Sequence, residues 1–184
     1  VKEGSSTLTL SGANTYSGGT TVSAGTLAGN ATSLQGNIVN NATVDFNQTT
    51  AGTYAGTMSG SGNLVKEGSS TLTLSGPNTY SGGTSLNAGT IAVSNNTALG
   101  TGTLAMATGT TLQAASSVAL ANAVSTTGIA TVDTNGNNLG LSGIISGAGA
   151  LTKTGIGTAT LSGANTYSGG TTVSAGTLAG NTTS

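Results

Sequence analysis

Four carboxylates are the side chains of this sequence best suited to acid–base chemistry. They are Glu3, Asp45, Glu67 and Asp133. Cleavage of a glycosidic bond needs two carboxyl groups about 5 to 9.5 Å apart, because one protonates the leaving group while the other activates water or attacks the sugar. Asp45 and Asp133 occupy matching positions of a long repeat, so about four turns of chain, or roughly 20 Å, would separate them in a stacked fold. We therefore expect solvated surface carboxylates and no catalytic pair.

Most other reactive groups are missing from the 184-residue chain, which contains no His, Cys, Trp or Arg. Imidazole and thiolate metal sites, Ser-His and Cys-His nucleophile pairs and arginine clamps are therefore excluded. Three Lys and four acids give a formal net charge of −1, so no basic patch can neutralise phosphates or hold an anionic membrane. The sequence predicts a protein that is not an enzyme, with no catalytic, cofactor-binding or metal-binding residue and no nucleic-acid partner.

Two Lys-Glu pairs, Lys2-Glu3 and Lys66-Glu67, begin two copies of the motif VKEGSSTLTL. We expect these pairs to keep the surface soluble or to mark the start of a strand. A third copy has Thr154 in place of the glutamate, which agrees with a role that is not chemical.

Tyrosine and asparagine recur in a second motif, Asn-Thr-Tyr-Ser-Gly-Gly. Its copies contain the pairs Asn14 and Tyr16, Asn78 and Tyr80, and Asn165 and Tyr167. A row of exposed tyrosine rings could stack on sugars. The pattern favours instead a ring that covers the backbone of its own corner beside the two glycines, and an asparagine that forms the turn.

Repetition organises the whole chain. The main motif begins at Val1, Val65 and Thr152, and the similarity extends upstream, since ATVD from Ala42 matches ATVD from Ala130. We expect one continuous segment over residues 1–184. Its expected parts are a repeat tail over 1–30, a repeat unit over about 42–94, linking turns over 95–129 and a repeat unit over about 130–181.

Alternating apolar and polar residues predict short strands. Leu72 and Leu74, for example, stand between threonines and a serine. The breaks between such runs contain Gly-Gly, Asn-Gly and Asn-Asn, which supply tight corners. The most helix-like stretch, residues 115–124, contains serines and β-branched valines, which argue against a helix.

Strands of about five residues with small side chains favour an all-β fold, a parallel β-solenoid in which each turn pairs with the next about 4.8 Å away. At about twenty residues per turn, the chain makes about eight or nine turns, a rod of roughly 40 Å. An antiparallel sandwich gives no reason for the same residues to recur across a long unit. A left-handed hexapeptide helix requires a six-residue period, and a disordered linker has no reason to keep the alternation.

The residues that carry a family resemblance are SGSGNLVK from Ser59, LTLSG from Leu72, NTYSGGT from Asn78 and AGTI from Ala88. Together they closely resemble the passenger-associated repeat of bacterial autotransporters. The resemblance implies a right-handed parallel β-helix at the bacterial cell surface or outer membrane, or secreted, which forms or carries an adhesin. The partners it implies are the flanking turns of the same passenger and a C-terminal β-barrel translocator outside this chain.

The residues and the resemblance together predict a structural or adhesive segment of an autotransporter passenger. It would act through a rigid rod, and through polar faces that contact a cell surface or a like chain. The alternatives are a carbohydrate-binding or carbohydrate-degrading β-helix protein and a subunit that assembles end to end into filaments. Because Val1 and Ser184 fall inside the repeat pattern and the net charge is only −1, we expect the isolated chain to associate end to end.

The alternation places Leu74 inside the fold and Asp45 outside, opposite Val44. Leu74→Asp should therefore lower the free energy of unfolding by several kcal/mol, because a carboxylate loses its hydration and an apolar contact is lost with it. Asp45→Asn should change that free energy little. Urea midpoints that fall equally in the two variants would contradict this assignment of inside and outside.

Overall fold

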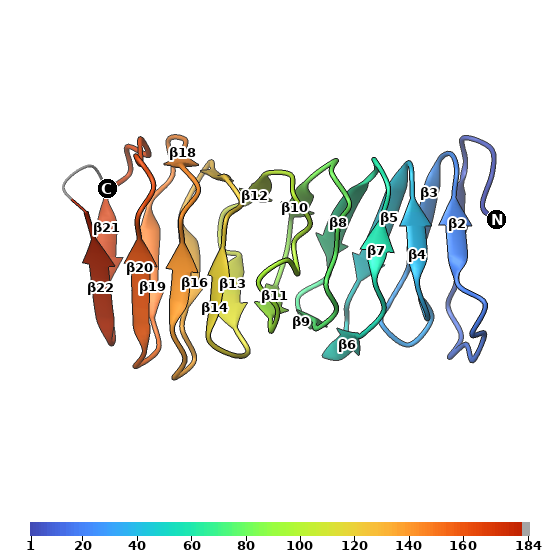
Figure 1. The fold of residues 1–184 in the computed structure, drawn as a ribbon, viewed down its shortest axis with the longest axis horizontal. Coiled ribbons are helices and arrows are strands. Elements are labelled where there is room, and N and C mark those ends of the chain that lie inside the picture. The colour runs from blue at the N-terminus through green and yellow to red at the C-terminus, as the bar shows by residue number, and fades with distance from the viewer. Residues whose placement is uncertain (182–184) are drawn as a thin grey trace.

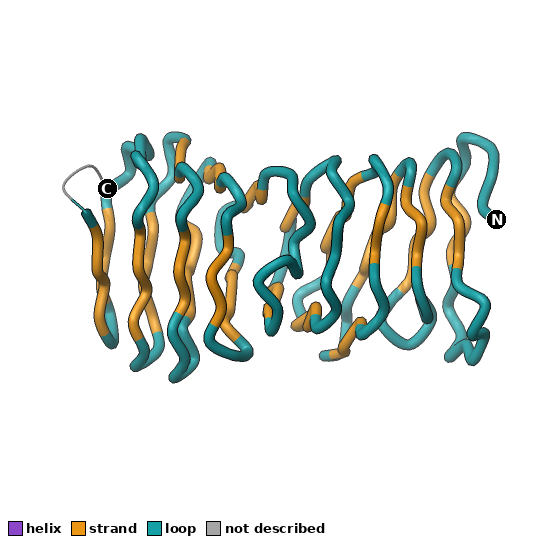
Figure 2. The backbone as a smooth tube through the Cα atoms, in the orientation of Figure 1, coloured by secondary structure: helices purple, strands orange, loops and turns teal. Residues whose placement is uncertain are grey.

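The structure is a computed structural model that describes residues 1–181. In this part of the chain the regular secondary structure is entirely β-strand (Figure 2). The strands pair in parallel. The turns stack along one long axis, with β2 (Thr20–Val22) near one end and β22 (Thr177–Gly180) at the other (Figure 1). The predicted parallel β-solenoid is confirmed, with about nine turns.

Sheets form three sides of the rod. The eight strands of sheet 1 are, in order, β1 (Thr7–Thr9), β3 (Thr26–Gly29), β5 (Thr43–Asn47), β8 (Asn63–Glu67), β10 (Thr84–Leu86), β12 (Leu104–Met106), β15 (Val124–Thr126) and β18 (Ile145–Ser146). The seven strands of sheet 2 are β6 (Gly52–Tyr54), β9 (Thr71–Leu74), β11 (Thr90–Val93), β13 (Thr111–Ala114), β16 (Ala130–Asp133), β19 (Leu151–Thr154) and β21 (Thr171–Val173). The third side holds two shorter sheets: sheet 3a with β2, β4 (Ile38–Asn40) and β7 (Met58–Ser59), and sheet 3b with β14 (Val118–Leu120), β17 (Leu139–Leu141), β20 (Thr158–Leu161) and β22.

The chain visits the three sides in a fixed order. From β5 in sheet 1 it passes to β6 in sheet 2 and β7 in sheet 3a, and then returns to sheet 1 as β8. One circuit takes about twenty residues, since the consecutive register partners in sheet 1 are Leu64, Thr84, Leu104 and Val124. This agrees with the turn length that the sequence predicts. Residues 115–124 contain β14 and the start of β15, so the absence of a helix there is also confirmed.

The alternation of side chains selects the interior. In sheet 2, Leu72, Ile91, Leu112 and Val132 are consecutive register partners, and all four are buried. Leu74 is buried as predicted. Each such side chain contributes roughly 1.5–3 kcal/mol of stability when it leaves water, and together they form one core cluster along the rod.

Close stacking also fixes the residue type at some corners. Gly89 has φ +69°, and a Cβ atom at this position would lie 2.6 Å from the carbonyl oxygen of Gly68 in the neighbouring turn. Both the backbone angle and the lack of space require glycine. The Ala-Gly pair of the repeat motif is therefore a point of contact between turns.

Candidate functional site

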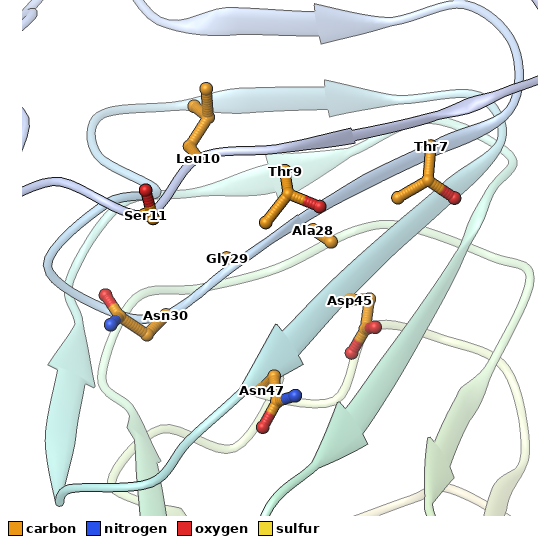
Figure 3. Close-up of a pocket in the computed structure, with 9 residues that line it drawn as sticks. All are labelled: Thr7, Thr9, Leu10, Ser11, Ala28, Gly29, Asn30, Asp45 and Asn47. Atoms are coloured by element: carbon orange, nitrogen blue, oxygen red, sulfur yellow. The ribbon is translucent and has the colours of Figure 1, made fainter.

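A hollow of about 420 Å³ lies on the outer face of sheet 1 (Figure 3). Ala28 lies in its middle, because the strand register places this residue between Thr9 of β1 and Asp45 of β5. The hydroxyl and amide side chains that line it are Thr7, Thr9, Ser11, Asn30 and Asn47. The hollow thus combines a small apolar surface with hydrogen-bonding groups around it.

Asp45 is the charged group of this hollow. Its Oδ1 atom is buried and has no hydrogen-bond partner among the described residues. Burial raises the pKa of the Asp45 carboxyl, the charge of Glu67 raises it further, and the charge of Lys66 opposes them. A buried carboxylate oxygen without a donor is an unsatisfied acceptor, and this is unfavourable for the charged form.

The carboxylate nearest in register to Asp45 is Glu67, a neighbour that the matching repeat positions do not predict. Glu67 is the register partner of Asn47 on the adjacent strand, two positions along from Asp45. Its Oε1 accepts a hydrogen bond of 2.7 Å from Asn87 Nδ2. The twenty-residue turn is the signal that could have found this neighbour, because it brings residue 65 beside residue 45.

Asp133 lies in sheet 2, on a different side of the rod from Asp45. It accepts hydrogen bonds from Gln113 Nε2 at 2.7 Å and from the backbone N–H of Asn135 at 2.9 Å. The two aspartates are about four turns apart along the rod, as expected, because β8, β10, β12 and β15 follow β5 in sheet 1 and β16 comes directly after β15. They also lie on different sides of the rod. Of the four carboxylates only Glu3 is exposed, while the other three are half-buried. The expectation of solvated carboxylates is therefore too simple.

The lysines lie inside the rod, so the expectation of Lys-Glu pairs at the surface is wrong for the lysine of each pair. The exposed fractions are 6% for Lys2, 0% for Lys66 and 2% for Lys153. In β8, Leu64 and Lys66 are buried while the residues between and after them are only half-buried. The alternation that places Leu64 inside therefore also places Lys66 inside.

Each lysine ammonium group donates to backbone carbonyl oxygens at two corners, an arrangement we call the lysine clip. The acceptors belong to the next residue, to the residue after it, and to an alanine 22 positions further along. Lys66 Nζ donates to Glu67, Gly68 and Ala88 at 2.7, 2.7 and 3.1 Å. Lys2 Nζ donates to Glu3, Gly4 and Ala24 at 3.0, 2.7 and 2.8 Å. Lys153 Nζ donates to Thr154, Gly155 and Ala175 at 2.6, 2.7 and 3.1 Å, and to Thr134 Oγ1 at 3.0 Å.

The chemistry of the lysine clip is that of a caged cation. A protonated lysine has three N–H donors and no acceptor, which matches the three carbonyl oxygens. Hydrogen bonds from a charged donor are roughly twice as strong as neutral ones, and they offset part of the cost of removing the charge from water. The clip therefore satisfies three backbone groups with one side chain.

The tyrosines of the repeat motif form internal contacts. Tyr80 is fully buried, its hydroxyl is hydrogen-bonded to Thr84 Oγ1, and a Cβ atom at Gly100 would collide with the backbone carbonyl oxygen of Tyr80 and lie close to its ring. Tyr16 and Tyr167 are partly buried, and each hydroxyl is hydrogen-bonded to the threonine four residues on. The rings therefore do not form an exposed row. They belong to the interior side of the turn and not to its outer corner.

Tyr54 lies outside the repeated motif, so the repeat pattern predicts no role for it. It is 2% exposed and packs against Phe46 with ring centroids 5.3 Å apart. Its hydroxyl donates to the carbonyl oxygen of Gly36 or Thr57, at 2.9 and 3.1 Å.

The asparagines of the repeat motif link neighbouring turns, which corrects the expectation that they form the local turn. Asn78 is 1% exposed; its Oδ1 accepts from the N–H of Met58 at 2.7 Å, and its Nδ2 donates to the carbonyl oxygen of Ala98 at 2.6 Å. One amide side chain thus connects three successive turns. Asn14 makes the contact to the following turn, and Asn165 the contact to the preceding one.

A second, smaller hollow lies further along the same outer face. Its volume is about 200 Å³, and its lining includes Ser85, Asn87, Ser125 and Thr127. Among residues 1–181, no group of three or more His, Cys, Asp or Glu side chains could hold a metal ion. Hydroxyl and amide groups therefore dominate the chemistry of this face.

The protein is thus a parallel β-solenoid whose sequence contains a repeated motif. The family model of the passenger-associated transport repeat matches residues 1–28, 64–93 and 151–179. The chain therefore carries three copies of this repeat, and the repeat and the fold fit the passenger of a bacterial autotransporter. No curated protein and no solved structure matched the chain. Within the described part, no helix is long and apolar enough to cross a membrane.

The internal titratable groups predict how stability depends on pH. Burial lowers the pKa of the Lys66 ammonium group to about 8, against 10.5 in an unfolded chain, while Glu67 and Asp45 oppose the shift. Between these values the unfolded chain binds more protons than the folded chain, so stability should rise as the pH increases from about 8 to about 10. Burial also raises the pKa of Tyr54 and Tyr80. Stability should therefore fall above pH about 10, where tyrosines of the unfolded chain ionise.

Urea midpoints measured at intervals from pH about 7.5 to about 11 should pass through a maximum near pH 10. The same series on Lys66→Met should show a flatter rise. A wild-type midpoint that falls steadily from pH 8 upward would contradict the inferred cost of the buried charge.

Proposed function

We propose that this chain is a non-catalytic stalk segment of an autotransporter passenger, located at the bacterial cell surface or secreted. The observation that carries the proposal is the continuous parallel stack of about nine turns along one axis. Each turn adds about 4.8 Å in one direction, and neighbouring turns hold one another through backbone hydrogen bonds. Such a rod fixes a distance between a distal activity and the membrane.

The repeat supports this location and partner. A passenger-associated transport repeat implies linkage to a translocator domain outside this chain. The proposed stalk needs no substrate, since its function is geometric. The expected end-to-end association of isolated chains remains a prediction.

A distance measurement tests the stalk. The chain has no cysteine, so spin labels can be placed through Val39→Cys and Ile156→Cys, whose native side chains are 42% and 83% exposed. Duplication of residues 104–123 inserts one complete turn between the labels, because Leu104 and Val124 are register partners. The label separation along the axis should increase by about 4.8 Å with a narrow distribution.

A matched control inserts twenty Gly and Ser residues at the exposed corner beside Gly136, where they should loop out and leave the distance unchanged. A broad distance distribution in the parent chain, or no increase after the duplication, would reject the rigid rod.

A second candidate function is adhesion to uncharged carbohydrate through the hollow at Asp45. The favouring observation is the placement of the Asp45 carboxyl in a hollow lined by hydroxyl and amide side chains. Sugar hydroxyls are donors that a carboxylate oxygen accepts. The lysines are inside the rod, so no cationic side chain at this surface would recognise an acidic sugar, and an uncharged one fits better.

Calorimetric titration with maltohexaose and cellohexaose, and with a heparin oligosaccharide as the acidic comparison, tests this candidate. Binding of a neutral sugar that is lost in Asp45→Ala and kept in Asp133→Ala, on sheet 2, would support it. New reducing ends in the same samples would indicate degradation. If neither neutral sugar binds at millimolar concentration, the candidate is rejected, and the stalk is unaffected.

A further inference from the structure

Each lysine clip has three backbone carbonyl acceptors, and all three belong to the same repeat copy as the lysine. The copies matched by the family model span 1–28, 64–93 and 151–179. Their distal acceptors, Ala24, Ala88 and Ala175, fall inside these ranges. A copy can therefore close its clip with no contribution from the chain that follows it.

The three clips occupy three different sides of the rod. Lys2 forms a bridge with Val22 of sheet 3a, Lys66 lies in β8 of sheet 1, and Lys153 lies in β19 of sheet 2. Copies of the same motif thus begin on each side in turn. The clips are distributed around the rod as well as along it.

A solenoid without special contacts loosens turn by turn, because each turn touches only its neighbours. The strand ladders hold the sides of the rod together by backbone hydrogen bonds. The corners have no such ladder, so they should open most easily. A lysine clip joins two successive corners of one side through charge-assisted bonds. Opening the second turn of a copy breaks the bond to the distal alanine and leaves the ammonium group without its full set of acceptors.

We propose that the lysine clip locks each repeat copy, so that the two successive turns that the clip joins open together and loosening of the rod stops at the copies. The lysine is a positioning residue in this inference, because it acts by holding the backbone of both corners. The lock depends on N–H donors and not on side-chain volume. A side chain of similar length without donors should therefore fail to replace it.

Hydrogen exchange on the whole chain compares Lys66→Met with the control Leu86→Met. Leu86 is the register partner of Lys66 in the next turn, and it is fully buried. In Lys66→Met, the amides of Ser70 and Ala88, which lie at the two clipped corners, should exchange about tenfold faster or more. The amide of Ser142, between copies two and three, should be unchanged. Leu86→Met, a substitution that conserves volume, should leave all three amides close to the wild type.

Chemical rescue tests whether the lock depends on the N–H donors of Lys66 or only on the space that its side chain fills. Lys66→Ala removes the part of the side chain that n-propylammonium would replace. Added n-propylammonium should restore slow exchange at Ser70 and Ala88. n-Butane fills the same space without N–H donors and should not restore slow exchange, nor should sodium chloride of equal ionic strength.

Two results would overturn the lock. One is unchanged exchange at Ser70 and Ala88 in Lys66→Met. The other is equal rescue of Lys66→Ala by n-propylammonium and by n-butane. If the Lys66 variants fail to fold, the same comparison uses Lys153→Met, whose clip lies in sheet 2, with the Ser174 amide, which donates to the Lys153 carbonyl, as the reporter.

Discussion

The rod depends on finding a partner for every backbone N–H and C=O group as the chain turns three corners in each circuit. Along the sides, parallel ladders do this without help from side chains. At the corners the ladder is interrupted, and carbonyl groups meet the interior. Lysine supplies the missing donors in each repeat copy, Asn122 Nδ2 supplies one to Gly102 at 2.8 Å, and Thr126 Oγ1 supplies one to Gly128 at 2.7 Å. The polar residues of the interior are therefore needed by the backbone and are not exceptions to the apolar core.

This requirement explains which features of the structure could be predicted from the sequence and which could not. Alternation and corner residues were sufficient to predict the strands, the parallel stack and the burial of Leu74, because these follow from local geometry. Lys66 was misplaced because charge is a strong argument for the surface, whereas the carbonyl groups that receive the charge become visible only when two turns are stacked. The role of Asn78 was missed for the same reason, since its partners are about twenty residues away in both directions. The proximity of Asp45 and Glu67, in contrast, could have been predicted from the turn length alone, because a circuit of about twenty residues places their two strands side by side.

The repeat and the circuit of the rod have different lengths, and this shapes the surface. Since copies begin on different sides, identical motifs do not stack on themselves. The outward row of sheet 1 therefore contains Ala28, Asp45, Val65 and Ser85, and not a ladder of one residue type. Identical side chains in register favour tight zippers between sheets, and the outer face of sheet 1 lacks such rows.

The burial of all three lysines also affects cleavage of the chain by proteases. The chain has no arginine, so an enzyme that cleaves after basic residues has only Lys2, Lys66 and Lys153 as targets, and these are at most 6% exposed. In the folded rod these residues are buried, while a chain whose turns have opened exposes them. A protease that cleaves after basic residues should therefore cut opened chains and leave the completed rod intact.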